Sequence, residues 1–113
     1  MAAFASGCVS LGNTDAVNKA NELAISCRTD EALALAAQTA NGQTLAGGIA
    51  ELQRVVFLRD AGRIAEADRA LQARNQRVNA DAAARAETEE SVRESLTELR
   101  TEREERTDSS VCK

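Results

Sequence analysis

The chain of 113 residues contains no Pro, Trp, Tyr or His, and its only aromatic residues are Phe4 and Phe57. Strands draw on aromatic and β-branched residues, and their turns draw on Pro and Gly, so this composition disfavours a β-sandwich or barrel. Ala, which has the best intrinsic helix propensity, is instead the commonest residue. The sequence therefore predicts one all-α domain with a modest core.

The absence of His also limits the chemistry of the chain. His is the commonest general base near neutral pH and the commonest metal ligand, and the three Cys residues are too widely spaced to form a zinc set. A catalytic Cys would have no His partner. We therefore expect no enzymatic activity, no metal and no other cofactor.

The formal net charge of −4 comes from one end of the chain. The segment from Glu87 to Arg106 contains eight Glu and four Arg residues, whereas acidic and basic residues cancel over the rest. Nucleic acids are bound through clustered Lys and Arg, but the Arg-rich stretch 54–77 has Asp and Glu residues interleaved with its cations. We interpret this stretch as a solvated helix face and expect no nucleic-acid partner.

The stretch from Leu45 to Leu71 predicts two amphipathic helices with a break at Ala61-Gly62. Gly62 tolerates the positive φ that closes the last turn of a helix cheaply. Apolar residues recur with the spacing of a helix that has one buried face, namely Leu45, Ile49, Leu52, Val56, Ile64, Ala67, Leu71 and Val78. The predicted unit is an antiparallel helical hairpin.

A second predicted hairpin precedes this one. Asn13 or Thr14 can cap its first helix, and Thr29 can cap its second helix, which ends at Asn41-Gly42. The inward stripe of the first helix is expected to contain Val17, Ala20, Ala24 and Cys27. Gly47-Gly48 lies inside the next helix, where two glycines are costly, and predicts the close approach of a neighbouring helix backbone, with a hinge as the alternative.

The two hairpins contain an internal repeat, because residues 27–32 parallel residues 62–67 at an offset of 35 positions. A two-helix unit of this period resembles the tetratricopeptide (TPR) class, whose unit is 34 residues. Gly62, Ala67 and Leu71 match the turn Gly, the small Ala and the following large apolar residue of that family. The chain departs from the family pattern at Arg54, Arg74 and Asn79. Such units need three or more copies to form an array, so the resemblance implies a TPR-like bundle.

No Pro or Gly interrupts the helical pattern after Arg63. A straight helix from there to Arg106 would span about 66 Å at 1.5 Å per residue, far longer than the bundle. The best candidate break is Asn79-Ala80-Asp81, since Asp81 could cap a new helix. Beyond it we predict a long charged helix with a thin apolar seam, which could support a short coiled coil or docking on the hairpins. The seam contains Val92, Leu96 and Leu99.

Residues Ala5-Ser6-Gly7-Cys8 resemble the lipobox of bacterial lipoproteins, in which small residues precede a Cys that is acylated. The resemblance implies lipidation of Cys8, and Val9 in place of an Asp after this Cys implies the periplasmic face of the outer membrane. The preceding residues are too few and lack the Lys or Arg of a complete signal peptide. Three interpretations remain open: an internal Met of a longer precursor whose upstream residues are missing, a sequence cut at the edge of the lipobox, and an ordinary N-terminus with a chance Cys.

If Cys8 is acylated, Cys27 and Cys112 remain as an even pair, which an oxidising periplasm would be expected to join. Cys27 lies at the first predicted turn, at the same end of the hairpins as Gly62. A helix that turns near residues 79–81 would return Cys112 to that end, whereas a straight helix would carry it tens of ångströms away. The alternative is three unrelated thiols in a cytoplasmic protein.

These features predict three segments: a lipobox and tether over 1–13, a TPR-like helical bundle over 14–79, and a charged C-terminal helix and tail over 80–113. The small size, helix content and implied anchor resemble secretin pilotins and other accessory lipoproteins. The resemblance implies binding to another envelope protein, or to a secretion or assembly complex, and assistance with its assembly, localisation or stability. The expected contact residues are Arg54, Arg59, Arg63, Glu98 and Glu102.

Two other functions remain open from the sequence. One is a structural protein that forms homo-oligomers through a coiled coil of its C-terminal helix. The other is a cytoplasmic regulator that uses the central hairpin as a helix-turn-helix.

Overall fold

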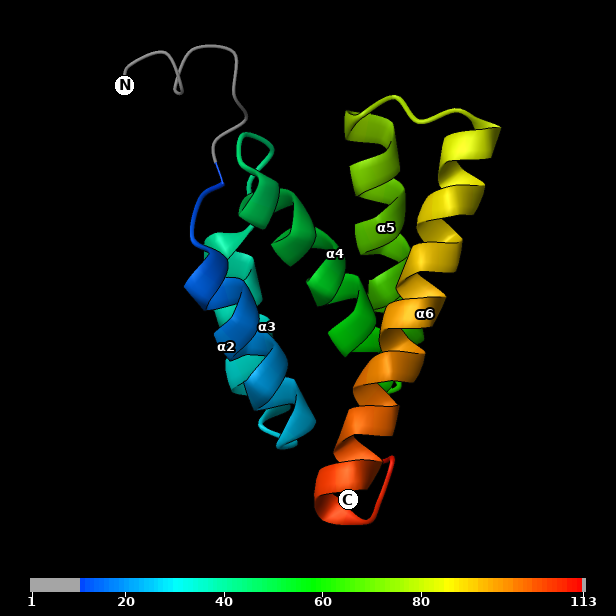
Figure 1. The fold of residues 1–113 in the computed structure, drawn as a ribbon. Helices are drawn as coiled ribbons and strands as arrows, with labels where there is room; N and C mark the ends of the chain where they lie inside the picture. Colours follow the sequence, from blue (N-terminus) through cyan, green and yellow to red (C-terminus); the bar gives the residue numbers. More distant parts are fainter. Residues whose placement is uncertain (1–10, 113) are drawn as a thin grey trace.

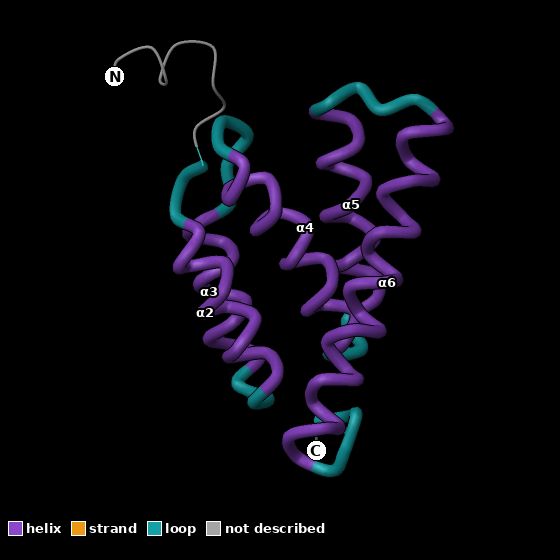
Figure 2. The backbone as a smooth tube through the Cα atoms, in the orientation of Figure 1, coloured by secondary structure: helices purple, strands orange, loops and turns teal. Residues whose placement is uncertain are grey.

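The computed structural model describes residues 11–112, and over this range the chain is all-α, as predicted (Figure 1). The helices in chain order are α2 (Thr14–Ile25), α3 (Thr29–Thr39), α4 (Leu45–Asp60), α5 (Ile64–Arg77) and α6 (Ala82–Thr107). Short loops join them, so that α2 with α3 and α4 with α5 form antiparallel hairpins (Figure 2).

The helices form two groups, and α4 lies between these groups. In Figure 1, α2 and α3 lie on one side, α5 and α6 lie on the other, and α4 crosses from the first to the second. α6 packs against α2 and α4. Residues 80–112 therefore share a core with residues 14–79.

The turns within the two hairpins have the same geometry, which explains the sequence repeat. Cys27 (φ 62°) and Gly62 (φ 78°) both adopt the left-handed backbone conformation. In each turn the next N–H, from Arg28 or Arg63, donates at 2.8 Å to the carbonyl five residues before it. This bond is characteristic of the Schellman motif, which satisfies a carbonyl at the end of a helix. Each arginine also pairs with the glutamate three residues further on.

Local capping signals correctly predicted most helix ends. Asn13 and Asp81 each accept a hydrogen bond from the backbone N–H three residues later, at 3.0 and 2.8 Å. The break at residues 79–81 is confirmed, because α5 ends before it and α6 begins after it. The prediction that Thr29 caps α3 is wrong, since Thr29 is already helical and Arg28 occupies the cap position without a side-chain hydrogen bond.

Alanine supplies much of the core, which allows the helices to approach closely. The fully buried alanines are Ala20, Ala24, Ala32, Ala36, Ala46, Ala50 and Ala67. Larger buried side chains come from α2 and α4, and they are Ile25, Val55, Phe57 and Leu58. The apolar seam of α6 also enters this core, with Val92 and Leu99 buried and Leu96 packed against them. Of the two uses predicted for the seam, the structure therefore shows docking on the hairpins.

The predicted buried face of the central hairpin is only partly correct. Three of its members are buried, which are Val56, Ala67 and Leu71. Four others remain 42–51% exposed, and they are Leu45, Ile49, Ile64 and Val78. α4 carries apolar residues around most of its circumference, so the helical period alone does not define its inward side. The small residues Ala46 and Ala50 pack inward because they permit closer contact.

Two further expectations for the first half of the chain are also corrected. Cys27 lies in an exposed turn and not on the inward stripe of α2, where Ala16 is buried instead. A Cβ atom at Gly47 would lie 2.4 Å from the Asn41 side chain, whereas one at Gly48 would meet no atom of the described chain within 4 Å. The close approach thus involves one glycine and a loop side chain, and not a neighbouring helix backbone.

Candidate functional site

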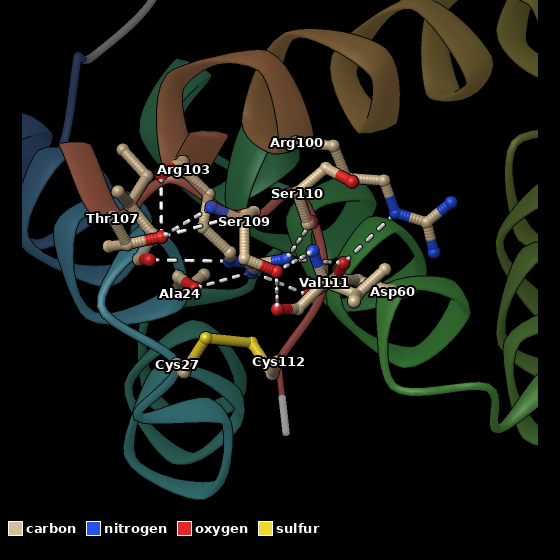
Figure 3. The surroundings of a disulfide bond; sticks show 11 residues. Ala24, Cys27, Asp60, Arg100, Arg103, Thr107, Ser109, Ser110, Val111 and Cys112 are labelled. Carbon is tan, nitrogen blue, oxygen red and sulfur yellow. Dashed lines mark hydrogen bonds and ion pairs between the residues drawn. A yellow bond between two sulfur atoms is a disulfide. The ribbon is translucent and has the colours of Figure 1, made fainter. Parts of the chain in front are cut away.

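A disulfide fastens the C-terminal tail to the turn between α2 and α3 (Figure 3). The sulfur atoms of Cys27 and Cys112 are 2.11 Å apart, and their Cα atoms are 5.5 Å apart. Both residues are exposed. The structure therefore places the predicted pair at bonding distance, because the break at residues 79–81 lets α6 return to this end of the bundle.

A buried ion pair lies beside the disulfide (Figure 3). The side chain of Arg103 is 0% exposed and that of Asp60 is 3% exposed. Arg103 donates to the two carboxylate oxygens of Asp60 at 2.9 and 2.7 Å. It also donates to three backbone carbonyls at 2.6, 3.3 and 2.9 Å, those of Ala24, Ile25 and Ser110. One guanidinium thus joins the ends of α2 and α4 to the tail.

This pair was not predicted from the sequence, although the position of Arg103 on α6 provides a signal for it. Arg103 lies four residues after Leu99 and seven after Leu96, so it shares the apolar face of α6. A charged residue in that position has to be paired when the face packs. Burial by itself would raise the pKa of Asp60, but hydrogen bonds from Arg103 and Arg100 outweigh burial and lower that pKa. Because both partners are inaccessible, we assign the pair a structural role.

The arginines predicted to contact a partner occupy different environments. The side chain of Arg59 is only 14% exposed and donates two hydrogen bonds of 2.8 Å to Glu89, so it joins α4 to α6 and is not the exposed residue expected. Arg63 is exposed and pairs with Glu66, whose pKa its hydrogen bond lowers. Arg54 is half-buried on α4. The three side chains therefore do not form one uniformly exposed cationic face.

A groove of about 350 Å³ lies between α2, α4 and α6, and we call it the central groove. Its apolar lining residues are Ile49, Leu52, Val56 and Phe57 of α4 with Val92 and Leu99 of α6. Its polar lining residues are Asn21, Gln53, Ser91, Ser95, Glu98 and Glu102. The predicted contact residues Glu98 and Glu102 thus come together at one site, and the structure adds an apolar floor to it.

A second groove of about 280 Å³ adjoins the central groove over α4. Ile49 and Leu52 line both grooves, which makes the two surfaces continuous. Leu45 and Val78, two of the exposed apolar residues, line the second groove. Three of the four apolar residues that were wrongly expected in the core therefore lie along one surface that follows α4.

One buried polar atom of a groove-lining residue has no hydrogen-bond partner among residues 11–112. The Nε2 of Gln53 donates to the carbonyl of Val17 at 2.9 Å. Its Oε1 is buried and accepts no hydrogen bond from any residue in the range 11–112. An unsatisfied buried acceptor costs about 1–3 kcal/mol, and a donor in the groove would reach this one only after the Gln53 side chain turns toward it.

Comparisons of the chain with protein-family models, curated proteins and solved structures found no match.

The lipobox-like residues Ala5 to Cys8 lie outside the described residues. Within residues 11–112, no group of three or more His, Cys, Asp or Glu side chains is arranged to hold a metal ion. None of the helices in this range has the length and apolar composition needed to cross a membrane.

Proposed function

We propose that this protein is a non-catalytic bacterial lipoprotein that binds another envelope protein. It assists the assembly, localisation or stability of a complex at the periplasmic face of the outer membrane. A lipid on Cys8 anchors the chain, and the TPR-like bundle is the binding domain.

The observation that carries this proposal is the pair Cys27–Cys112 at disulfide distance. Disulfides form and persist in oxidising compartments, including the bacterial periplasm, and are rare in the cytosol. Both cysteines are exposed, so the bond would be accessible to cytosolic thiols. A periplasmic location explains an exposed structural disulfide, and an acylated Cys8 explains how the third cysteine avoids mispairing.

The surface supports a binding role over the two alternatives. Exposed apolar residues that line grooves are typical of interaction sites. Val92 and Leu99 are used inside the monomer, which leaves a coiled coil of α6 without its main apolar contacts. Arg59 and Arg63 pair with glutamates of the same chain, which weakens the electrostatic attraction that a DNA-binding hairpin needs.

The direct test is the intact mass of the protein expressed from its native gene, measured with and without reductant and alkylation. We expect diacylglycerol and acyl mass on Cys8 and two cysteines that become alkylated only after reduction. A Cys8→Ser variant is the control, and it should lose the lipid and membrane association while it keeps the disulfide. An unmodified N-terminus with three free thiols would refute both the anchor and the periplasmic location.

A further inference from the structure

The floor of the central groove extends beyond the groove itself. Ile49 is 42% exposed and lies where the two grooves adjoin, so the apolar surface continues along α4 from α6 toward α5. An elongated surface of this kind matches a segment with several apolar side chains better than one compact small molecule. An amphipathic helix supplies such side chains at i, i+3 or i+4, and i+7.

The rim of the central groove has a single sign of charge. Glu98 and Glu102 are the only charged residues among those described that line it, and they lie one turn apart on α6. Glu98 forms no ion pair with any residue from 11 to 112. Within the same range, Glu102 pairs only with Arg106, at 3.5 Å and in an exposed position where such pairs contribute little. The rim therefore favours an occupant with positive charge.

The wall of the groove also contains a polar side chain. Gln53 lines the groove, and its buried Oε1 has no donor among the described residues. Lys and Arg are donors only, so a cationic side chain that enters beside apolar ones would complement the rim, and it would reach this acceptor only after the Gln53 side chain turns toward the groove.

We propose that the central groove binds an amphipathic helical segment of a partner protein in which Lys or Arg flanks the apolar stripe. This inference rests on the proposed function and specifies the chemistry of the partner. The apolar side chains of the segment pack on Ile49 and Leu52, and its cations face Glu98 and Glu102.

The test uses the full chain and a fluorescein-labelled Leu/Lys peptide of about 18 residues, which is long enough to form a helix. Two matched probes keep the length, one with the same residues in scrambled order and one with Glu in place of Lys. Binding is measured by fluorescence anisotropy at two salt concentrations. We expect the helical Leu/Lys peptide to bind most tightly and to weaken as salt increases.

Variants of the protein locate the binding site. The double variant E98Q/E102Q and the single variant Ile49→Ser should each raise the Kd by about tenfold. Ser95→Arg, at an exposed position on the same rim, should also weaken binding because it introduces a cation. The matched controls are Ile64→Ser, which is exposed outside both grooves, and E94Q/E104Q, which removes the same charge from α6 away from the groove. These controls should leave the Kd unchanged, and circular dichroism should show the same helix content in every variant.

Several results would overturn the inference. Equal binding of the scrambled peptide would show that a helical apolar face is not recognised. Equal binding of the Leu/Glu peptide would show that positive charge is not recognised. Equal weakening by the groove variants and the controls would place the site elsewhere. A dimer in sedimentation that Ile49→Ser or Ser95→Arg abolishes would show that a second copy of this chain fills the groove.

Failure of this inference can be separated from failure of the proposed function. Photo-crosslinkers placed at Ser95 in the groove and at Glu104 outside it are compared in cells. A protein cross-linked from Glu104 but not from Ser95 would overturn the inference and keep the binding role. An unlipidated Cys8 would instead overturn the proposed anchor, whatever the peptide measurements show.

Discussion

Replacing Asp60 by Asn removes the charge that faces a fully buried guanidinium. Asp60 accepts two hydrogen bonds from Arg103, at 2.9 and 2.7 Å, and one from Arg100, at 3.2 Å. An amide oxygen could accept only part of this set, and the amide NH₂ would turn its hydrogens toward a cation. Arg103 would stay buried with backbone carbonyls as its remaining partners.

The expected decrease in the unfolding free energy follows from this arrangement. Removal of one partner from a buried ion pair costs about 3–5 kcal/mol, because the other charge stays desolvated. Proteins of this kind have total unfolding free energies of about 5–15 kcal/mol, so Asp60→Asn should remove a large part of the stability. At about 4 °C per kcal/mol, the Tm should fall by about 12–20 °C.

Far-UV circular dichroism is the suitable assay, because the chain has no Trp or Tyr to report on unfolding by fluorescence. For the oxidised protein, urea unfolding gives the unfolding free energy and thermal unfolding gives the Tm. Asp68→Asn is the control, since that side chain is 65% exposed and lies 3.9 Å from Arg59, and it should cost less than about 1 kcal/mol.

A double variant tests the cause of the loss. Asp60→Leu with Arg103→Met removes both charges and should recover part of the stability, because no buried charge is left unpaired, while the three backbone carbonyls lose the donor that Arg103 supplied. A loss below about 1 kcal/mol for Asp60→Asn would refute the reasoning. So would a double variant that is as unstable as the single one.

Three further predictions concern the disulfide, the pH dependence and a turn. Cys112→Ser opens a loop that spans a sequence separation of 85 and should lower the unfolding free energy by up to about 4–5 kcal/mol, measured in urea against the wild type with and without reductant. Asp60 and Glu89 have lowered pKa values, so their contribution is complete above the unfolded values near 4 and is lost as the pH falls through the folded ones. At pH values below about 4, the urea concentration at the unfolding midpoint should therefore decrease, and the decrease should be smaller in Asp60→Asn than in the wild type. Equal decreases in the two proteins would show that Asp60 does not cause the pH dependence. Gly62→Ala should cost about 1 kcal/mol through its positive φ alone, since no described atom lies within 4 Å of the added Cβ, and no measurable loss would contradict this account.

The helices and turns were predictable because their signals are local. Gly62 and Asp81 determine helix ends through the conformation or hydrogen bonds of a few neighbouring residues. The disulfide could be predicted for a related reason, since one break near Asn79 decides whether Cys112 returns to Cys27. These features can be predicted without knowing which helix faces pack together.

The orientation of α4 and the position of the groove were not predictable in this way. α4 is apolar on several sides, and the choice between Ile49 and Ala50 as an inward residue depends on how closely α2 and α3 approach. Charge alone pointed to Glu98 and Glu102, but the apolar floor between α2, α4 and α6 exists only after the helices pack. The position of Arg103 on the apolar face of α6 indicates that it needs a partner, but that partner, Asp60, lies 43 positions away and is identified only once the helices pack.

The disulfide between Cys27 and Cys112 also determines how the folded chain would respond to a pulling force. It joins the turn after α2 to the tail after α6, so α3, α4, α5 and α6 all lie inside the closed loop. Tension applied between the start of α2 and Cys112 would pass along α2 and then directly through the two sulfur atoms. Only α2 would be stretched, and the helices inside the loop would carry force only after reduction. In an oxidising compartment, the greater part of the bundle is therefore shielded from unfolding by tension between its ends.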